Sequence, residues 1–137
     1  MMNCTVRIEF SAAKRLMGYK GKCGFLHGYR HAVEASFTAA KGKNGIAVDF
    51  YEIKSCLQKW LDKNWDHNVL LNRADKKLGD AIEKITSQKI FYLANNPTAE
   101  NMAEYLFKEI CPKLIKGGRC VKLRVYDNPD AWVETQG

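Results

Sequence analysis

The sequence predicts an α+β domain in which helices cover one face of an antiparallel sheet. Residues 5–10 and 27–39 alternate apolar and polar side chains, which is the pattern of half-buried strands. Residues 48–63 instead repeat apolar side chains at the spacing of one helix face. Because the first two strands have hairpin-length spacing and helices and further strands follow, we expect an antiparallel sheet with its helices on one side.

The composition is that of a single globular domain over residues 1–137. Of the residues, 46% are hydrophobic and 27% are charged. The chain has no run of about 18 apolar residues, so no membrane span is expected. A domain of this size has a small core, to which oligomerisation would add stability. The net charge of +7 suits an anionic ligand or nucleic acid, and a well-solvated surface has the same charge.

The cysteines indicate a reducing environment. The five cysteines are odd in number and scattered, and the N-terminus lacks the pattern of a signal peptide. We therefore expect free thiols and a cytoplasmic protein.

The first half of the chain contains two of the expected strands. The strand at residues 5–10 ends at the small residues 11–13, which permit close backbone approach. Residues 14–26 contain three glycines and are expected to form a long loop. The second strand follows at residues 27–39, and residues 41–45 form a turn.

The middle of the chain is expected to be mainly helical. Asp49 is the expected N-cap of the helix at residues 48–63. Residues 64–75 are less regular, residues 76–86 form a short helix, and residues 90–93 form a strand.

A helix and a strand are expected near the C-terminus. Thr98 caps the helix, and Pro112 marks its end. Residues 121–125 alternate as a last strand, and a short tail follows Asp130.

Residues 22–31 are the stretch densest in reactive groups. Cys23 follows Lys22 and precedes His27 by four residues. A nearby cation and imidazole lower the pKa of a thiol, so Cys23 is a candidate nucleophile or base. The alternative is a small loop cysteine without a role.

Three aromatic or imidazole side chains share one face of the second strand. His27, Tyr29 and His31 lie on its apolar face, where polar groups need partners, so they are candidates for a pocket wall. His27 and His31 with Cys23 could bind zinc, because imidazole and thiolate are zinc ligands. Two strand residues usually bind one ion from positions i and i+2, and the residue at i+2 from His27 is Tyr29, which is a poor zinc ligand. The residues alone therefore indicate only a weak metal site.

Two further segments are candidates for chemistry. In Asp66-His67 the carboxylate could orient the imidazole and raise its basicity. Adjacent side chains often point apart, so a solvated loop pair is the alternative. Residues 96–101 form a helix N-terminus with free N–H groups for a ligand, or an ordinary helix start.

Taken together, five runs resemble the 6-pyruvoyltetrahydropterin synthase / 6-carboxytetrahydropterin synthase family. They come in the order of the family and cover nearly the whole chain. The runs are Phe10-Ser11-Ala12-Ala13, Lys22 to Gly28, Gly45 to Phe50, Trp65-Asp66-His67 with Leu71-Asn72, and Asn96 to Asn101.

The resemblance implies the tunnelling fold, in which each subunit is a four-stranded antiparallel sheet with helices on one face. Three subunits close a twelve-stranded barrel, and two trimers stack into a homo-hexamer. It also implies a lyase acting on the pterin 7,8-dihydroneopterin triphosphate. One branch of the family makes 6-pyruvoyltetrahydropterin. The other releases acetaldehyde and triphosphate to leave 6-carboxytetrahydropterin, a precursor of queuosine.

The resemblance assigns roles residue by residue. Cys23 matches the catalytic cysteine, and Asp66 and His67 match its acidic and imidazole partners in proton transfer. Thr98 and Glu100 match positions that line the pterin site.

Near the C-terminus the sequence departs from the family. Asp127 and Asn128 stand where the family has a Glu-Thr pair whose glutamate holds the pterin. Glu134 and Thr135 are a literal Glu-Thr pair, but they align less well. The resemblance therefore gives Asp127 the role of binding the pterin.

The zinc ligands depart further. The family holds zinc with three histidines, and this chain keeps only His27, with Lys14 and Tyr29 at the other two positions. His31 is a candidate substitute ligand. We therefore expect no metal or a weakly bound one. We expect Lys14 to replace part of the electrostatic role of zinc, with Tyr29 holding a second substrate oxygen. The alternative is that Lys14 merely reaches solvent.

The retained and lost positions favour different functions. Retained Cys23, Asp66 and His67 favour an enzyme with altered or lost zinc dependence. Lys14 and Tyr29 favour a catalytically inactive pterin-binding homologue of the same fold. Nucleic-acid binding is supported only by net charge, so neither a nucleic-acid nor a membrane partner is expected.

Overall fold

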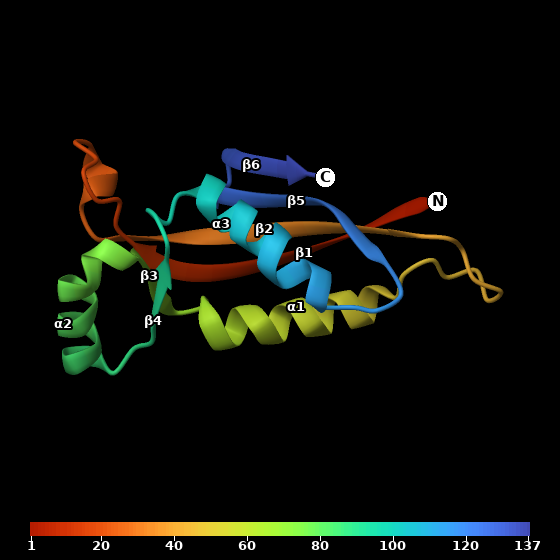
Figure 1. Ribbon diagram of the computed structural model, residues 1–137, viewed down its shortest axis with the longest axis horizontal. Coiled ribbons are helices and arrows are strands. Elements are labelled where there is room, and N and C mark those ends of the chain that lie inside the picture. Colours follow the sequence, from red (N-terminus) through yellow and green to blue (C-terminus); the bar gives the residue numbers. More distant parts are fainter.

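The protein has an α+β fold built on a strongly curved sheet (Figure 1). The computed structural model describes residues 1–137. Its sheet has six strands in the order β4-β3-β1-β2-β5-β6. Four of them are antiparallel neighbours, as the resemblance implied. These four are β1 (Met2–Lys14), β2 (His27–Ala39), β5 (Arg119–Asn128) and β6 (Ala131–Gln136).

Two short strands correct the expected topology. β3 (Asn68–Asn72) pairs in parallel with β1, and β4 (Ile90–Leu93) pairs in parallel with β3. The expected strand at residues 90–93 is therefore present, but it is a parallel edge strand rather than an antiparallel one. The expectation that residues 64–75 lack regular structure was wrong, because β3 lies within them.

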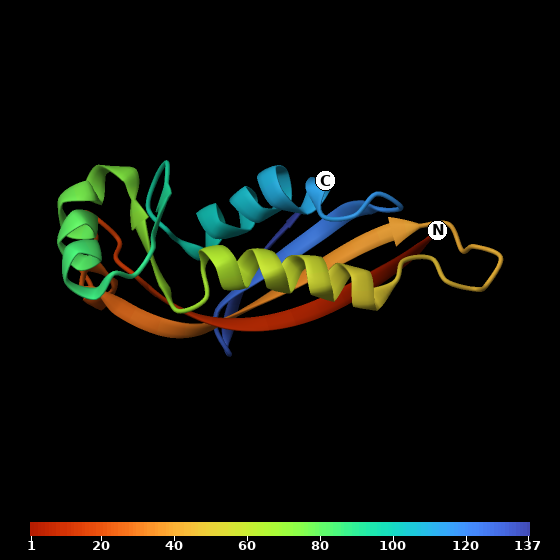
Figure 2. The same ribbon diagram turned by 90° about the horizontal axis from the view of Figure 1, so that it is seen from below.

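Two helices cover one side of the sheet. Figure 2 shows α1 (Phe50–Asn64) and α3 (Ala99–Tyr105) on the same side of the curved sheet, with α2 (Lys76–Thr86) at one end. α3 continues as a single π-helical stretch, Leu106–Ile110. Short 3₁₀ turns occur at Lys22–Gly24, Arg73–Asp75 and Cys111–Lys113.

The helix caps follow the sequence prediction. The Asp49 side chain accepts a hydrogen bond from Tyr51 N–H at 2.8 Å, and Thr98 Oγ1 accepts one from Asn101 N–H at 3.1 Å. A side-chain oxygen at this position satisfies an N–H that has no partner within the helix. No helix of the protein is long and apolar enough to cross a membrane.

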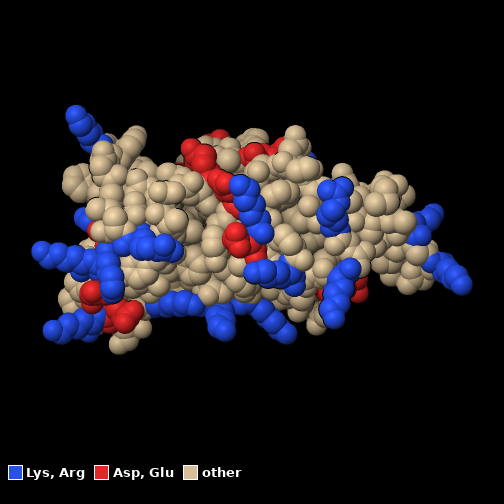
Figure 3. Space-filling model, viewed as in Figure 1, with Lys and Arg blue, Asp and Glu red and all other residues tan.

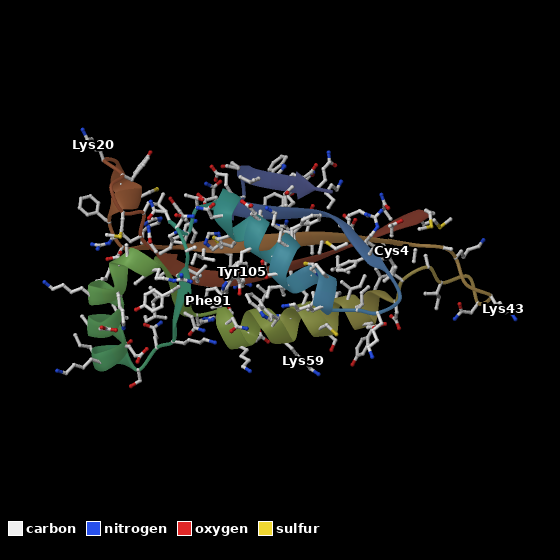
Figure 4. All side chains as sticks on the ribbon, in the orientation of Figure 1. Cys4, Lys20, Lys43, Lys59, Phe91 and Tyr105 are labelled. Carbon is white, nitrogen blue, oxygen red and sulfur yellow. The ribbon has the colours of Figure 1, made fainter.

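The core lies between the sheet and the two helices α1 and α3. Trp60, Trp65, Phe91 and Tyr105 form an aromatic group within it, in which the rings of Phe91 and Tyr105 are 5.5 Å apart (Figure 4). Trp65 is fully buried and directly precedes Asp66. The core therefore fixes the backbone from which the predicted Asp66-His67 pair projects.

β1 is longer than predicted, and this changes the environment of Lys14. The strand runs to Lys14 rather than ending at Phe10, and Lys14 pairs with His27 on β2. Because side chains alternate along a strand, Phe10, Ala12 and Lys14 point to the same, helix-covered face. Lys14 is therefore a strand residue and not the start of a loop.

Candidate active site

A cavity of about 390 Å³ lies at the end of the β1–β2 ribbon. It gathers side chains from β1, the 15–26 loop, β2, the start of α3, β5 and β6. Six of the predicted site residues line it, namely Lys14, Cys23, His27, Thr98, Glu100 and Asp127. Residues separated by more than a hundred positions in the sequence thus meet in one place.

The loop that carries Cys23 is held by backbone hydrogen bonds. Leu16 N–H donates to the Cys23 carbonyl at 3.0 Å, which closes the loop. The Asn96 side chain accepts from Met17 N–H and donates to Met17 C=O, both at 2.9 Å. Asn96 thereby ties the loop to the segment before α3.

Lys14 is buried and ion-paired. It is 2% exposed, its ammonium donates to Asp127 Oδ1 at 2.6 Å, and Met102 Sδ lies 3.9 Å away. The alternative that Lys14 merely reaches solvent is therefore wrong. Asp127 is 31% exposed in its side chain, and its Oδ2 makes no hydrogen bond within the chain. The carboxylate predicted to bind a ligand is thus partly neutralised by a buried cation.

The two histidines of β2 each have one fixed and one free ring nitrogen. His27 Nδ1 lies 2.7 Å from Phe25 C=O, and His31 Nδ1 lies 3.0 Å from Tyr126 C=O. A carbonyl oxygen only accepts, so both Nδ1 atoms carry the hydrogen. In the neutral imidazole each Nε2 then has a free lone pair, and both Nε2 atoms are buried without a partner.

Burial keeps His31 neutral. The side chain is fully buried, and burial lowers its pKa to about 4, with the positive charge of Lys14 as the next largest cause. His31 does not line the cavity, since it lies deeper in the sheet than His27.

Tyr29 links the histidines to Cys23. Its ring centroid lies 5.1 Å from that of His27 and 6.1 Å from that of His31. The electrostatic interaction with Cys23 is the largest cause that raises the pKa of Tyr29, and burial is the next. Tyr29 therefore lies beside the candidate nucleophile, although it lines a different cavity.

The residues at the expected metal positions do not fit a zinc ion. An ammonium has no lone pair, so Lys14 cannot be a ligand, and its charge repels a cation. No group of three or more His, Cys, Asp or Glu side chains in the chain could hold a metal. The alternative of His27, His31 and Cys23 as ligands therefore does not form a site here.

Asp66 and His67 contact each other, although adjacent side chains often diverge. His67 adopts φ +60°, and its Nδ1 lies 2.9 Å from Asp66 Oδ2. Ser11 N–H donates to Asp66 Oδ1 at 2.9 Å. Burial opposes the charged form, but hydrogen bonds from Ser11 and His67 lower the pKa of Asp66. The pair is thus a carboxylate holding an exposed imidazole.

Within one chain, this pair does not face Cys23. His67 lines a second cavity of about 330 Å³ with Ser11 and Arg30. Tyr29 also lines this second cavity, whereas Cys23 lines only the first. The structure brings together the predicted pocket residues but leaves the predicted acid–imidazole pair elsewhere.

Sequence reasoning missed several residues of the first cavity. Leu16 and Tyr19 come from the loop, and Ala131, Trp132 and Val133 come from β6, which the sequence analysis treated as a tail. Recognition of β6 would have needed the pairing of Val133 with Val125, which no local pattern shows. The anchoring role of Asn96 also has no local signal.

Comparisons with known proteins agree with the fold. A family model described as 6-pyruvoyl tetrahydropterin synthase matches residues 3–137. A curated protein of Rickettsia felis named 6-carboxy-5,6,7,8-tetrahydropterin synthase is 46% identical, over 98% of this chain and 99% of that protein. A curated protein of Archaeoglobus fulgidus, named putative 6-carboxy-5,6,7,8-tetrahydropterin synthase, is 30% identical over 94% of this chain and 90% of that protein.

Solved structures share the fold at low sequence identity. The 6-pyruvoyl tetrahydropterin synthase of Caenorhabditis elegans is 19% identical, with a TM-score of 0.71 over 99% of this chain and 95% of that one. An uncharacterised protein of Wolinella succinogenes gives a TM-score of 0.74 at 14% identity. The match covers 99% of this chain and 98% of that one. These likenesses establish the architecture of the subunit.

Proposed function

Because the chain belongs to the 6-pyruvoyl tetrahydropterin synthase family, we propose that it is a 6-carboxy-5,6,7,8-tetrahydropterin synthase acting on 7,8-dihydroneopterin triphosphate. The observation that carries this proposal is the cavity in which Cys23, Thr98, Glu100 and Asp127 meet. The curated relatives of this name match almost the whole chain. The net charge of +7 also suits a triphosphate.

The cavity offers complementary groups for a pterin ring. The ring presents N–H donors, and Glu100 and the free Oδ2 of Asp127 are carboxylate acceptors on the cavity wall. Thr98 uses its hydroxyl to cap α3, so its contribution is to place the first turn of α3 against the cavity. Cys23, which lines the same cavity, is the proposed proton-transfer group.

We propose that the site is completed by a second copy of the chain. Cys23 and His67 open onto different cavities, so proton transfer between them needs the partner's His67. This arrangement agrees with a homo-oligomer, for which we propose a hexamer of two trimers. The five free cysteines suit a reducing, cytoplasmic location.

The experiment is a turnover assay with subunit mixing. The protein should release acetaldehyde from 7,8-dihydroneopterin triphosphate, and Cys23→Ala and His67→Ala should each abolish the release. When the two inactive variants are unfolded, mixed in equal amounts and refolded together, roughly a quarter of the sites should regain both groups. No turnover by the unmodified protein would overturn the proposed activity. Turnover without recovery on mixing would overturn the shared site alone.

A catalytically inactive pterin-binding protein is the second candidate. The Lys14–Asp127 ion pair favours it, because the pair occupies a carboxylate that would otherwise be free for the ring. This candidate predicts pterin binding without acetaldehyde release in the same assay.

A further inference from the structure

Three side chains of the first cavity surround a position where one buried polar atom, His27 Nε2, has no partner. They are Lys14, His27 and Asp127, which we call the Lys14 recess. We propose that the Lys14 recess binds the side-chain hydroxyls of the ligand without a metal, with Lys14 donating to a hydroxyl oxygen and His27 Nε2 accepting a hydroxyl hydrogen. This inference rests on the proposed function, since it concerns the side chain of the same pterin.

The donor side of the recess is the ammonium. Lys14 has three N–H donors, of which one goes to Asp127 and another has only the sulfur of Met102 at 3.9 Å. A thioether is a weak acceptor, and a buried cation is costly unless its donors are used. The remaining donor capacity is available to a ligand oxygen in the cavity that Lys14 lines.

The acceptor side is the imidazole of His27. Its Nδ1–H donates to Phe25 C=O at 2.7 Å, which fixes the ring and leaves Nε2 as the free ring nitrogen. That nitrogen is covered and has no partner in the chain, although buried polar atoms in proteins usually have one. His27 lines the same cavity as Lys14.

A hydroxyl group matches this pairing, whereas a metal ion does not. A hydroxyl both donates and accepts, so one such group can satisfy His27 Nε2 and Lys14 together. Tyr29 packs beside His27, with ring centroids 5.1 Å apart, but it lines the second cavity and takes no part in this pairing. A hydroxyl on the ligand therefore finds both a donor and an acceptor in the recess. The fixed cation also stabilises negative charge that develops on an oxygen in this sheltered position.

The test compares two ligands in the presence of a chelator. Calorimetry would measure the binding of 7,8-dihydroneopterin, whose side chain carries hydroxyls, and of 6-methyl-7,8-dihydropterin, whose side chain carries none. The unmodified protein should prefer the hydroxylated ligand by roughly tenfold to a hundredfold, the scale of one or two such hydrogen bonds.

Variants assign the preference to the recess. Lys14→Met and His27→Phe should each lose most of the preference while keeping the affinity for the methyl ligand. Lys20→Met, which removes an exposed lysine at the tip of the loop, should keep it (Figure 4). If Lys14→Met does not fold, Lys14→Met/Asp127→Asn removes both charges and serves in its place. Separately, Lys14→His/Tyr29→His should raise the zinc content of the purified protein.

The outcomes separate this inference from the proposed function. Equal affinity for the two ligands, or a preference that appears only when zinc is added, would overturn the metal-free recess and leave the pterin proposal standing. Failure of both ligands to bind would overturn the two together.

Discussion

Lys14 shows how one residue can redefine a site. A buried ammonium on an apolar face must find an anion or lose its proton, and the anion here is Asp127 of β5 rather than a ligand. The sequence indicated the need for a partner. It did not indicate which one, because the two residues are 113 positions apart. The ion pair in turn limits Asp127 to one free oxygen.

Removing one member of this ion pair should destabilise the fold. Asp127→Ala leaves the Lys14 side chain, which is 3% exposed, without its counter-charge. We expect the free energy of unfolding to fall by roughly 3 kcal/mol, the lower end for breaking a buried pair, because Asp127 itself is partly exposed. Lys14→Met/Asp127→Ala should recover most of this loss. Urea unfolding measures the free energy of unfolding of both variants. An unchanged midpoint in Asp127→Ala would show that the Lys14–Asp127 ion pair does not stabilise the fold.

His31 should make the stability fall in acid. Its folded pKa of about 4 lies below the ordinary value of 6.5, so between these values the unfolded chain binds a proton that the folded chain does not. The free energy of unfolding should therefore fall as the pH is lowered from 6.5 to 4, by on the order of 3 kcal/mol. The groups that face His31 are Lys14 of β1, His27 of β2 and Asp127 of β5.

The matched variant for this prediction is His31→Asn, whose amide keeps a donor for Tyr126 C=O. Its stability is expected to be lower at every pH, but with a flatter slope between pH 6.5 and 4. Chemical unfolding at several pH values gives the two slopes. Parallel slopes would show that His31 does not carry the acid sensitivity.

At the scale of elements, the sequence predicted what has a local pattern. The alternation of β2 and the helical periods and caps of α1 and α3 are confirmed by the structure. β3 was missed because its centre, Val69-Leu70-Leu71, is buried throughout and shows no alternation. The sequence also could not predict that His67 and Cys23 line different cavities, because this depends on how distant segments pack in the fold.

The packing of α2 on β4 gives an element-scale prediction. A Cβ added at Gly79 would lie 1.9 Å from the Tyr92 hydroxyl oxygen. Alanine is the better helix former by about 1 kcal/mol, but overpacking costs about 1–3 kcal/mol, so Gly79→Ala should destabilise the protein. In a Tyr92→Leu background the same substitution should cost less or stabilise. Lys77→Ala, at an exposed position of α2, is the control.

Thermal unfolding of the single and double variants forms a double-mutant cycle for this contact. A coupling energy near zero would mean that α2 does not rest on Tyr92 through Gly79.

At the scale of the whole molecule, the surface combines dispersed charges with exposed apolar side chains. Lys and Arg side chains are spread along the face shown in Figure 3 rather than gathered in one stripe. Large apolar side chains are exposed on the loop beside the cavity, among them Phe25 at 72% and Tyr19 at 57%. Exposed apolar groups close together mark interaction surfaces.

We therefore expect the purified protein to have the mass of six chains. Light scattering at micromolar concentration measures this mass. Phe25→Asp should shift it to smaller species, because a charge replaces an apolar contact, whereas Lys59→Asp, on the exposed side of α1 (Figure 4), should not. A monomeric unmodified protein would rule out both the hexamer and the shared site.

The most direct test of a metal-free pterin lyase is acetaldehyde release from 7,8-dihydroneopterin triphosphate with and without a strong chelator. We predict that turnover by the unmodified protein is the same in both, because Lys14 takes the position of a metal ligand and repels a cation. Turnover that stops with chelator and returns with added zinc would contradict the account.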